Sequence, residues 1–283
     1  MRVEIWGARG SIAAPGELTA RYGGNTACVS VRFDSGEVLI LDAGTGIRRL
    51  GNVLARQQPV TAHLFLSHCH WDHIQGFPFF KPAYLASTRL RIYSHHMPRQ
   101  QLRKTLTDQM VGAYFPLEFS GLSASIEFVK MDEHSLRVGP AEITAVETNH
   151  PGGGVGFRIA AEGRVFVYLT DNELADGNHE RFIDFCRGAD LLIHDAQYLP
   201  EELESHQGWG HSSYLEVLDL ARAAGVREVV LFHHDPDRTD AEIDAIVHAC
   251  HEEMRQRGDR FECFAASEGM VLTILTAGEP DRA

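Results

Sequence analysis

The sequence predicts an α/β protein built on mixed β-sheets, and three observations point to this class. Short apolar or β-branched runs of strand length recur from one end of the chain to the other. Turn residues at 34–36 and 162–163 join neighbouring runs as hairpins, so the sheets contain antiparallel pairs. Helical patterns are fewer, and two of them begin with a recognisable capping signal.

Eleven runs have the length and composition of strands. Turn residues separate them, so they predict many short strands in mostly antiparallel or mixed sheets. In chain order they are Val3–Trp6, Ala27–Phe33, Val38–Leu41, His63–Leu66, Leu90–Tyr93, Ile143–Val146, Val155–Ile159, Val165–Leu169, Leu191–Ile193, Val229–Phe232 and Met270–Leu275.

Two helices are predicted by capping boxes, in which a hydroxyl residue precedes a glutamate by three positions. The first box pairs Ser213 with Glu216, and the second pairs Thr239 with Glu242. A glycine follows each helical pattern, at 225 and at 258, and predicts where the helix stops. A third stretch, roughly residues 98–114, is rich in Gln, Arg and Lys, which predicts a partly exposed helical insertion around residues 95–120 that could form part of a lid.

Length and composition favour one domain over residues 1–283. The chain is 44% hydrophobic and 23% charged, as in ordinary globular proteins. Its longest apolar runs are far too short to cross a bilayer, and no secretory signal precedes the first strand-like run. Five scattered cysteines without a C-x-x-C pair argue against a disulfide framework. We therefore expect a cytoplasmic protein without a membrane partner.

The formal net charge of -13 restricts the partners. A protein that grips a long nucleic acid needs a basic excess to meet the phosphate backbone, and this chain has none. Long nucleic acids are therefore unexpected partners. Bound divalent cations would offset part of the negative charge, and the sequence leaves a homodimer open.

Four metal-ligand side chains lie within the six residues 68–73, directly after an apolar run. They are His68, His70, Asp72 and His73. Imidazole nitrogens and carboxylate oxygens are ligands that divalent zinc accepts, and one short loop gathers them at little cost in chain entropy. A polar loop with surface histidines is the alternative, but alternating His-x-His followed by Asp-His rarely arises by drift on a surface. The cluster alone could hold one metal ion.

Further candidate ligands follow the ends of four later strand-like runs. They are His150, Asp171, the pair His194-Asp195 and the triplet His233-His234-Asp235. Strand ends that meet at one edge of a sheet can bring such side chains together, which predicts a second metal ion. His194 is interpreted as a core histidine because it lies on its strand, so only Asp195 of that pair is kept as a site residue.

These residues resemble the pattern H-x-H-x-D-H, a later His, a later Asp and a final His of the metallo-β-lactamase fold superfamily. The resemblance implies a four-layer αββα sandwich with two mixed β-sheets. It also implies that His68, His70 and His150 hold one metal, that Asp72, His73 and a final His hold the second, and that Asp171 bridges the two. His233 and His234 compete for the final position, and His233 is preferred. Two Zn²⁺ are expected, with Mn²⁺ or Fe²⁺ as alternatives.

Two further motifs resemble the branch that includes ribonuclease Z and cyclic phosphodiesterases. I-H-D-A-Q-Y at 193–198 is similar to the H-E-A-T motif of ribonuclease Z, with Asp195 in place of Glu, and G-H-S-S at 210–213 is similar to its H-S-T motif. The resemblance implies that His211 lies beside the leaving group. An Asp that keeps an imidazole oriented and protonated makes a competent general acid.

Together these features predict a dinuclear metal-dependent phosphodiesterase that acts on a small cyclic or linear phosphodiester. Asp72 would orient or deprotonate the attacking water, and His211 with Asp195 would assist the departing alkoxide. A lactone, thioester or β-lactam hydrolase is the main alternative, because the same metal centre supports those reactions. A tRNA-processing nuclease and a non-catalytic metal-binding module are less favoured.

Glycine-rich segments near the N-terminus resemble a bacterial subgroup of the same fold. They are W-G-A-R-G-S at 6–11, Y-G-G-N-T at 22–26 and L-D-A-G-T-G at 41–46. Glycines there would let the backbone approach the metal loop closely, although a purely structural role is as plausible. Asp42 follows a strand, and we expect it to brace the metal loop, because carboxylates commonly orient ligating histidines.

Overall fold

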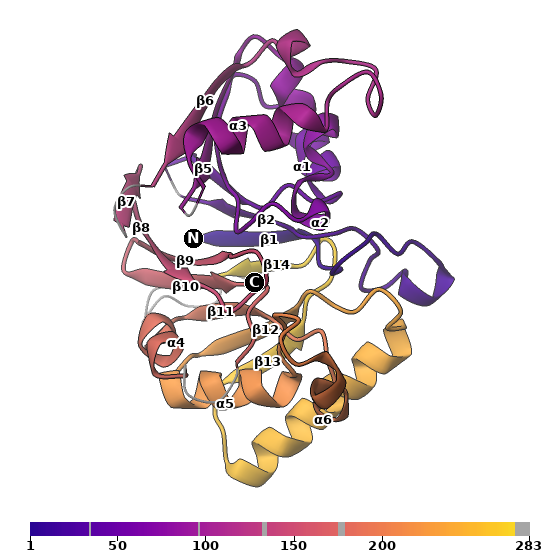
Figure 1. Ribbon diagram of the computed structural model, residues 1–283. Helices are drawn as coiled ribbons and strands as arrows, with labels where there is room; N and C mark the ends of the chain where they lie inside the picture. The colour runs from indigo at the N-terminus through magenta and orange to yellow at the C-terminus, as the bar shows by residue number, and fades with distance from the viewer. Residues whose placement is uncertain (34, 96, 132–134, 175–178, 275–283) are drawn as a thin grey trace.

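Two β-sheets stacked face to face form the centre of the molecule, and helices cover both outer faces (Figure 1). The computed structural model describes residues 1–274 apart from 34, 96, 132–134 and 175–178. The order of the layers is helices, sheet, sheet, helices, which confirms the predicted four-layer αββα sandwich.

The first sheet has seven strands in the order β14-β1-β2-β3-β4-β5-β6. Strands β3 to β6 run parallel to one another, and the remaining pairs are antiparallel, so the sheet is mixed as predicted. Its strands are β1 (Arg2–Gly7), β2 (Cys28–Arg32), β3 (Val38–Leu41), β4 (Val60–Phe65), β5 (Thr88–Ser94), β6 (Ser125–Lys130) and β14 (Val271–Thr273).

The second sheet has the order β13-β12-β11-β10-β9-β8-β7 and is also mixed. Strands β10 to β13 are parallel, so their carboxyl ends lie at the same edge of the sheet. Its strands are β7 (Ser135–Val138), β8 (Ala141–Glu147), β9 (Val155–Ala161), β10 (Arg164–Leu169), β11 (Leu191–Asp195), β12 (Glu228–Phe232) and β13 (Glu262–Ala265).

The helices form the two outer layers. Helices α1 (Ile47–Leu54), α2 (Trp71–Ile74) and α3 (Arg99–Asp108) lie on the side of the first sheet, and α4 (His179–Cys186), α5 (Tyr214–Ala224) and α6 (Asp240–Arg257) lie on the side of the second (Figure 1). Short 3-10 helices lie in the loops: η1 (Glu17–Thr19), η2 (Phe77–Phe79), η3 (Lys81–Tyr84), η4 (Phe119–Gly121) and η5 (Pro200–His206).

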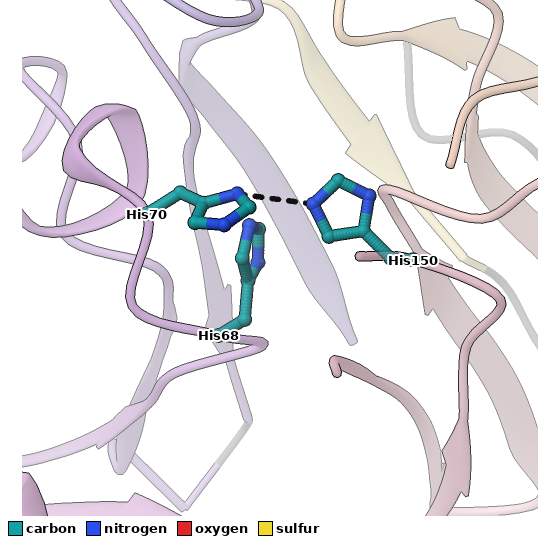
Figure 2. Close-up of side chains that lie close together, drawn as sticks. All are labelled: His68, His70 and His150. Carbon is teal, nitrogen blue, oxygen red and sulfur yellow. Dashed lines mark hydrogen bonds between the residues drawn. The ribbon is translucent and has the colours of Figure 1, made fainter. Parts of the chain in front are cut away.

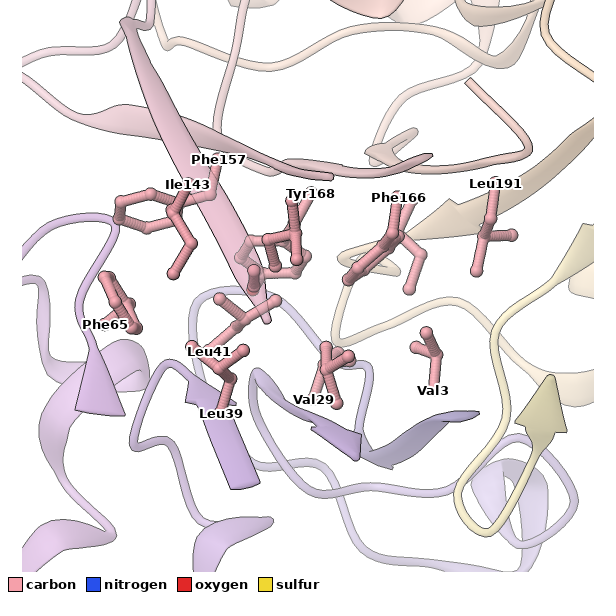
Figure 3. Close-up of a cluster of buried hydrophobic side chains, with 14 of the residues drawn as sticks. Val3, Val29, Leu39, Leu41, Phe65, Ile143, Phe157, Phe166, Tyr168 and Leu191 are labelled. Carbon is pink, nitrogen blue, oxygen red and sulfur yellow. The ribbon is translucent and has the colours of Figure 1, made fainter. Parts of the chain in front are cut away.

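Apolar side chains from both sheets fill the space between them (Figure 3). One sheet contributes Val3, Val29, Leu39, Leu41 and Phe65, and the other contributes Ile143, Phe157, Phe166, Tyr168 and Leu191. Most of these side chains are fully buried, and each such burial stabilises the fold by about 1.5–3 kcal/mol. The outer face of each sheet packs against a second apolar cluster, formed with the helices. Because strands with two buried faces need apolar residues at every position, the runs are almost continuously apolar.

The capping signals predicted two helix starts and two helix ends correctly. The Ser213 hydroxyl and the Glu216 carboxylate satisfy each other's backbone N–H groups at the start of α5, and Thr239 and Glu242 do the same for α6. Glycines at 225 and 258 end the helices with φ of 65° and 73°. The insertion contains α3, whose Leu102 and Leu106 are buried against the first sheet.

Three strands and three α-helices were not predicted. Strands β6, β7 and β13 are short and half polar, and each lies at the edge of a sheet, where only part of the strand is buried. Helix α1 contains Gly51, α2 is four residues long and α4 is eight residues long. Within the described part of the chain, no helix has the length and apolar character needed to cross a membrane.

Candidate metal centre

The predicted ligands meet at the ends of strands from both sheets. His68 and His70 follow β4, and Asp72 and His73 lie on the short helix α2 that comes next. From the second sheet, residues 150, 171 and 233 follow β8, β10 and β12. The two sheets therefore each supply part of one polar cluster, which is buried apart from its outer rim.

The first group of side chains is His68, His70 and His150, whose ring nitrogens lie within 4.8 Å of one another. Figure 2 shows His70 and His150 facing each other across the gap between their chain segments, with His68 completing the triangle. The Nδ1 atom of His70 is 3.0 Å from Nε2 of His150. His68 is buried, whereas His70 lies at the exposed rim of the site.

The second group is Asp72, His73 and His233. Oδ2 of Asp72 lies 3.2 Å from Nε2 of His73 and 3.1 Å from Nε2 of His233. All three side chains are at least 90% buried. Two imidazoles and one carboxylate that converge in this way make a ligand set for a divalent cation.

Asp171 lies between the two groups. Its Oδ1 atom is 3.3 Å from Nε2 of His73 and 3.4 Å from Nε2 of His233. Its Oδ2 atom is 3.6 Å from Nε2 of His68 and 3.8 Å from Nε2 of His150. One oxygen therefore faces each group, which is the position that a bridging carboxylate requires.

The structure separates the neighbouring candidates His233 and His234. The ring of His233 points into the cluster, whereas Nε2 of His234 hydrogen-bonds the carbonyl oxygen of Ala266, 2.9 Å away. Burial lowers the pKa of His234 to about 4, so it is a neutral core histidine. His194 is also fully buried and hydrogen-bonded within the fold, as interpreted from its place on a strand.

Hydrogen bonds at Nδ1 fix the orientation of the imidazole rings and leave Nε2 facing the cluster. Asp42 accepts from Nδ1 of His73 (2.9 Å), and the Gln197 side-chain oxygen accepts from Nδ1 of His233 (2.9 Å). The carbonyl of Gly210 lies 3.3 Å from Nδ1 of His150. When such a ring is neutral, donation from Nδ1 leaves its lone pair at Nε2.

His68 follows the same pattern through a serine. The Ser67 hydroxyl donates to Oδ2 of Asp42 (2.8 Å), so its oxygen accepts from Nδ1 of His68 (3.1 Å). Four histidines thus direct an Nε2 lone pair into the cluster, where the Asp72 and Asp171 carboxylates also direct theirs. When the rings are neutral these lone pairs repel one another, so the arrangement calls for cations, either protons or metal ions.

Two further observations support that conclusion. The buried Nε2 atoms of His68 and His73 have no hydrogen-bond partner within the described chain. Burial lowers the pKa of His73, but Asp72, Asp171 and Asp42 outweigh burial and raise that pKa well above its usual value. The protein surroundings therefore favour positive charge at this point, and the chemistry of the donor set fits divalent metal ions.

Asp42 braces the metal loop, as the sequence predicted. Besides the ring of His73, its carboxylate accepts from the Ser67 backbone N–H (2.8 Å), the Ser67 hydroxyl (2.8 Å) and the Tyr168 hydroxyl (2.8 Å). Asp42 is fully buried, so these donors have no alternative partner in water. The carboxylate holds the histidine-bearing loop against the second sheet.

Unusual backbone conformations concentrate at the site. Ser11, Asp42, Asp171 and His233 have positive φ between 51° and 62°, which costs non-glycine residues energy. The backbone N–H of Ser11 donates to Oδ2 of Asp72 at 2.8 Å. Left-handed residues immediately after strands turn their side chains abruptly toward the common edge.

Close packing explains part of the glycine-rich N-terminal pattern. A Cβ atom on Gly10 would lie 2.4 Å from the His233 ring, and one on Gly44 would lie 2.3 Å from the backbone oxygen of Asp72. Neither position can accept a side chain unless a ligand residue moves. These two glycines therefore have a structural role that determines the geometry of the site.

His211 and Asp195 lie beside the metal cluster on the side of the second sheet. Nδ1 of His211 donates to Oδ2 of Asp195 at 3.0 Å. The His211 ring stacks 5.0 Å from the His233 ring and lies 5.3 Å from the His150 ring. The shorter Asp195 therefore reaches the imidazole, although the related motif has Glu at this place. Burial lowers the pKa of His211, but the hydrogen bond that its ring donates to the Asp195 carboxylate outweighs burial, together with the nearby charge of Asp171, and the pKa is raised.

Sequence analysis did not identify several supporting residues. Ser67 and Gln197 fix ligand histidines, and the backbone N–H of Ser11 fixes Asp72. Glu173 accepts from the backbone N–H groups of Gly208 and Gly210, which holds the loop that carries His211. Only Gln197 had a local signal, because it follows Asp195 by two residues at the end of a strand.

The fold and the cluster of histidines and aspartates define a metal-dependent hydrolase with the metallo-β-lactamase fold. Residues 38–234 match the family model described as the beta-lactamase superfamily domain, which is more than half of the chain. The chain therefore belongs to the beta-lactamase superfamily.

Individual relatives agree with this assignment. The chain is 25% identical to ribonuclease Z of Haloarcula marismortui over 286 aligned positions, which cover 82% of this chain and 86% of that protein. Among solved structures, the metallo-β-lactamase fold protein YhfI from Bacillus subtilis matches with a TM-score of 0.71 and 22% identity, over 96% and 98% of the two chains. The short form of human tRNase Z matches with a TM-score of 0.68 and 19% identity, over 98% and 100%.

Proposed function

We propose that this protein is a dinuclear metal-dependent phosphodiesterase that hydrolyses a small cyclic or linear phosphodiester. The observation that carries the proposal is the hydrogen-bonded pair of His211 and Asp195, which faces the metal centre at stacking distance from His233. Hydrolysis of a phosphodiester releases one substituent as an alkoxide. The alkoxide needs a proton, which this pair can supply. The ribonuclease Z relatives support the same bond type.

Two divalent ions, most simply zinc, fit the ligand set in two groups. His68, His70 and His150 would hold one, and Asp72, His73 and His233 the other, with Asp171 shared. When bound, such a pair lowers the pKa of a shared water and neutralises charge on phosphoryl oxygens. The nitrogen and oxygen donors also suit Mn²⁺ and Fe²⁺. Zinc is proposed because each group offers three protein ligands and leaves a fourth position, which is the four-coordinate arrangement that zinc favours.

The protein's own groups orient the reactants. The Ser11 N–H fixes the Asp72 carboxylate, which would orient the attacking water or accept its proton. Asp195 accepts from Nδ1 of His211, which directs Nε2 away from Asp195, and in the protonated ring Nε2 carries the transferable proton. In this scheme His211 donates from Nε2 to the departing alkoxide, and Asp195 stabilises the charged ring before the transfer.

Lactone, thioester or β-lactam hydrolysis is the alternative on the same metal centre. A thioester expels a thiolate, which leaves without a strong need for a proton, so that reaction does not use the His211–Asp195 pair. A lactone releases an alkoxide and a β-lactam releases an amine nitrogen, so direct assay of these substrates separates them from a phosphodiester. The expected signature of a phosphodiesterase is therefore a large loss of turnover in His211→Ala with little loss of metal. For a thioester hydrolase the same substitution would be nearly silent.

Processing of tRNA is the second candidate, because ribonuclease Z is among the relatives. The net charge of -13 opposes it, since an RNA grip needs a basic surface. The insertion helix α3 carries Arg99, Arg103 and Lys104, and Lys104 is paired with Asp108. We therefore propose a small substrate, and a precursor tRNA belongs in the substrate panel as the comparison.

The test combines metal analysis with a substrate panel. Purified protein is analysed for metal content and then assayed on bis(p-nitrophenyl) phosphate, a cyclic nucleotide, a thioester, a lactone and a precursor tRNA. The proposal expects two metals per chain, turnover of phosphodiesters, and at least a hundredfold lower kcat in His211→Ala at unchanged metal content on the cyclic nucleotide, whose leaving group is an alkoxide. Well under two metals per chain, or equal activity on the thioester, would contradict it. His234→Ala is a matched control, because His234 lies outside the cluster.

A further inference from the structure

A cavity of about 500 Å³ lies behind the metal loop, between that loop and the end of the insertion. Its walls are mainly aromatic and apolar: Trp71, Ile74, Pro78, Phe79, Tyr114 and Phe115. A cavity of this size and character is typical of a site for part of a small organic molecule. It is separate from the metal cluster, and the metal-centre chemistry does not use its residues.

The cavity starts one residue away from a metal ligand. Cys69 and Trp71 line it, and they alternate with His68 and His70, which face the metal cluster. Successive residues of an extended segment point in opposite directions, so the loop is a thin wall between the two spaces. His70 lies at the exposed rim, and the Trp71 side chain beside it is 79% exposed. A molecule on the metals can thus reach over this rim into the cavity.

Two aromatic side chains of the cavity wall are largely exposed, although folding usually buries large apolar side chains. Tyr114 is 80% exposed and Phe79 is 54% exposed, although both are large hydrophobic side chains. Phe79 and Phe115 meet edge to face with ring centroids 5.4 Å apart. Contiguous exposed aromatic surface beside a catalytic centre marks a place where an apolar group binds.

The position of the cavity relative to His211 decides which group binds there. Asp195 ends strand β11 of the second sheet and His211 lies in the loop before α5, whereas the cavity lies on the side of the first sheet, beyond His70. The two ester substituents of a phosphodiester diverge from phosphorus. When one leaves toward His211, the other is directed away from it, toward the rim formed by His70 and Trp71.

We propose that this cavity is the specificity site for the non-leaving substituent, and that it selects phosphodiesters in which that substituent carries a flat aromatic ring. The proposal rests on the phosphodiesterase function. The ring lies among Trp71, Phe79 and Tyr114. Gln109 also lines the cavity, and its amide nitrogen has no hydrogen-bond partner in the described part of the chain, so the wall contains an unused donor.

The experiment compares substrates that share one leaving group. Metal-loaded protein is assayed on phenyl p-nitrophenyl phosphate and on methyl p-nitrophenyl phosphate, and the ratio of the two kcat/KM values is measured in the wild type and in variants. The phenyl-to-methyl ratio of kcat/KM should be at least about tenfold higher in the wild type than in Tyr114→Ala or Phe79→Ala, because these variants lose part of the apolar site for the phenyl group. Comparison between variants cancels the difference in intrinsic reactivity of the two esters.

Two controls make the result specific. Leu18→Ala removes another exposed apolar side chain far from the cavity in sequence and should leave the ratio unchanged. Metal content is measured for every variant, because Phe79 lies close in sequence to the ligand helix. Since Tyr114 is mostly exposed, its replacement should not impair folding.

The outcomes separate this proposal from the proposed function. Activity on both esters with a ratio that Tyr114→Ala and Phe79→Ala leave unchanged would overturn the specificity site while the phosphodiesterase function stands. A wild type that hydrolyses neither ester would overturn the function itself. If light scattering shows that Tyr114→Ala dissociates a dimer and the ratio is unchanged, the aromatic surface is an interface between copies and the proposal is wrong.

Discussion

Replacement of Asp42 tests whether a carboxylate that binds no metal controls the metal site. In Asp42→Ala, four buried donors lose their acceptor: the Ser67 backbone N–H and hydroxyl, the His73 ring N–H and the Tyr168 hydroxyl. Each unsatisfied donor costs about 1–3 kcal/mol, or about 4–12 kcal/mol in total. Because natural domains are stable by only about 5–15 kcal/mol, this variant should be severely destabilised.

The more informative variant is Asp42→Asn, which keeps the shape of the side chain. Its amide has one acceptor oxygen, so in either orientation a buried N–H group faces another donor. Loss of the carboxylate also removes the charge that orients His73. We expect an affinity for the metal that His73 ligates lower by about 10–100-fold, as is usual when such a supporting carboxylate is lost.

The assay is competitive titration of the metal-loaded protein with a chelator, with circular dichroism to verify the fold. Tyr168→Phe is the matched control, since it removes one of the hydrogen bonds to Asp42 but leaves the carboxylate on His73. This control should lose about 1 kcal/mol of stability and keep both metals. Wild-type metal affinity in Asp42→Asn would refute the argument that Asp42 fixes the imidazole.

Three further predictions concern neighbouring groups. His233→Ala should bind one metal fewer than His234→Ala, measured as metal per chain after dialysis, and equal loss would contradict the assignment of the final ligand. Asp195→Asn should move the alkaline limb of the kcat–pH profile to lower pH. His211 acts in its protonated form, so activity falls as the pH rises through the pKa of His211, and Asp195 raises that pKa. An alkaline limb at the wild-type pH would exclude the pairing. Gly10→Ala should reduce metal content, because its Cβ would lie 2.4 Å from the His233 ring, and a variant with full metal occupancy would show that the loop adapts.

Much of the fold could be predicted because its signals are local. Each of the eleven apolar runs forms or overlaps a strand of the sandwich in the described residues, and Leu275 of the last run lies outside them. Capping boxes predicted α5 and α6 because a cap depends on residues only three apart. Edge strands such as β7 escaped prediction because they are partly exposed, so nothing forces their sequence to be apolar.

The proposed ligands could also be anticipated, because a dense group of His and Asp at strand ends has few explanations other than a metal. Which of two adjacent histidines faces the cluster could not. Positive φ at His233 turns that ring toward Asp72, and the following residue then points to Ala266. A sequence specifies residue types, whereas the direction of a side chain after a strand depends on a backbone angle set by the surrounding fold.

The sequence by itself determined the layered α/β class, the position of the metal-binding loop and the pairing of Asp195 with His211 as a hypothesis. Only the tertiary structure decided which groups accept a hydrogen bond from Nδ1 of each buried histidine. The acceptors are Asp42 for His73, Ser67 for His68, Gln197 for His233 and the Gly210 carbonyl for His150, so that four Nε2 atoms converge. These contacts join residues from 1 to 60 positions apart, each within one half of the sandwich, and the four lone pairs converge because the two sheets pack against each other. Local patterns cannot encode that approach of the sheets, because it follows from packing of the whole core.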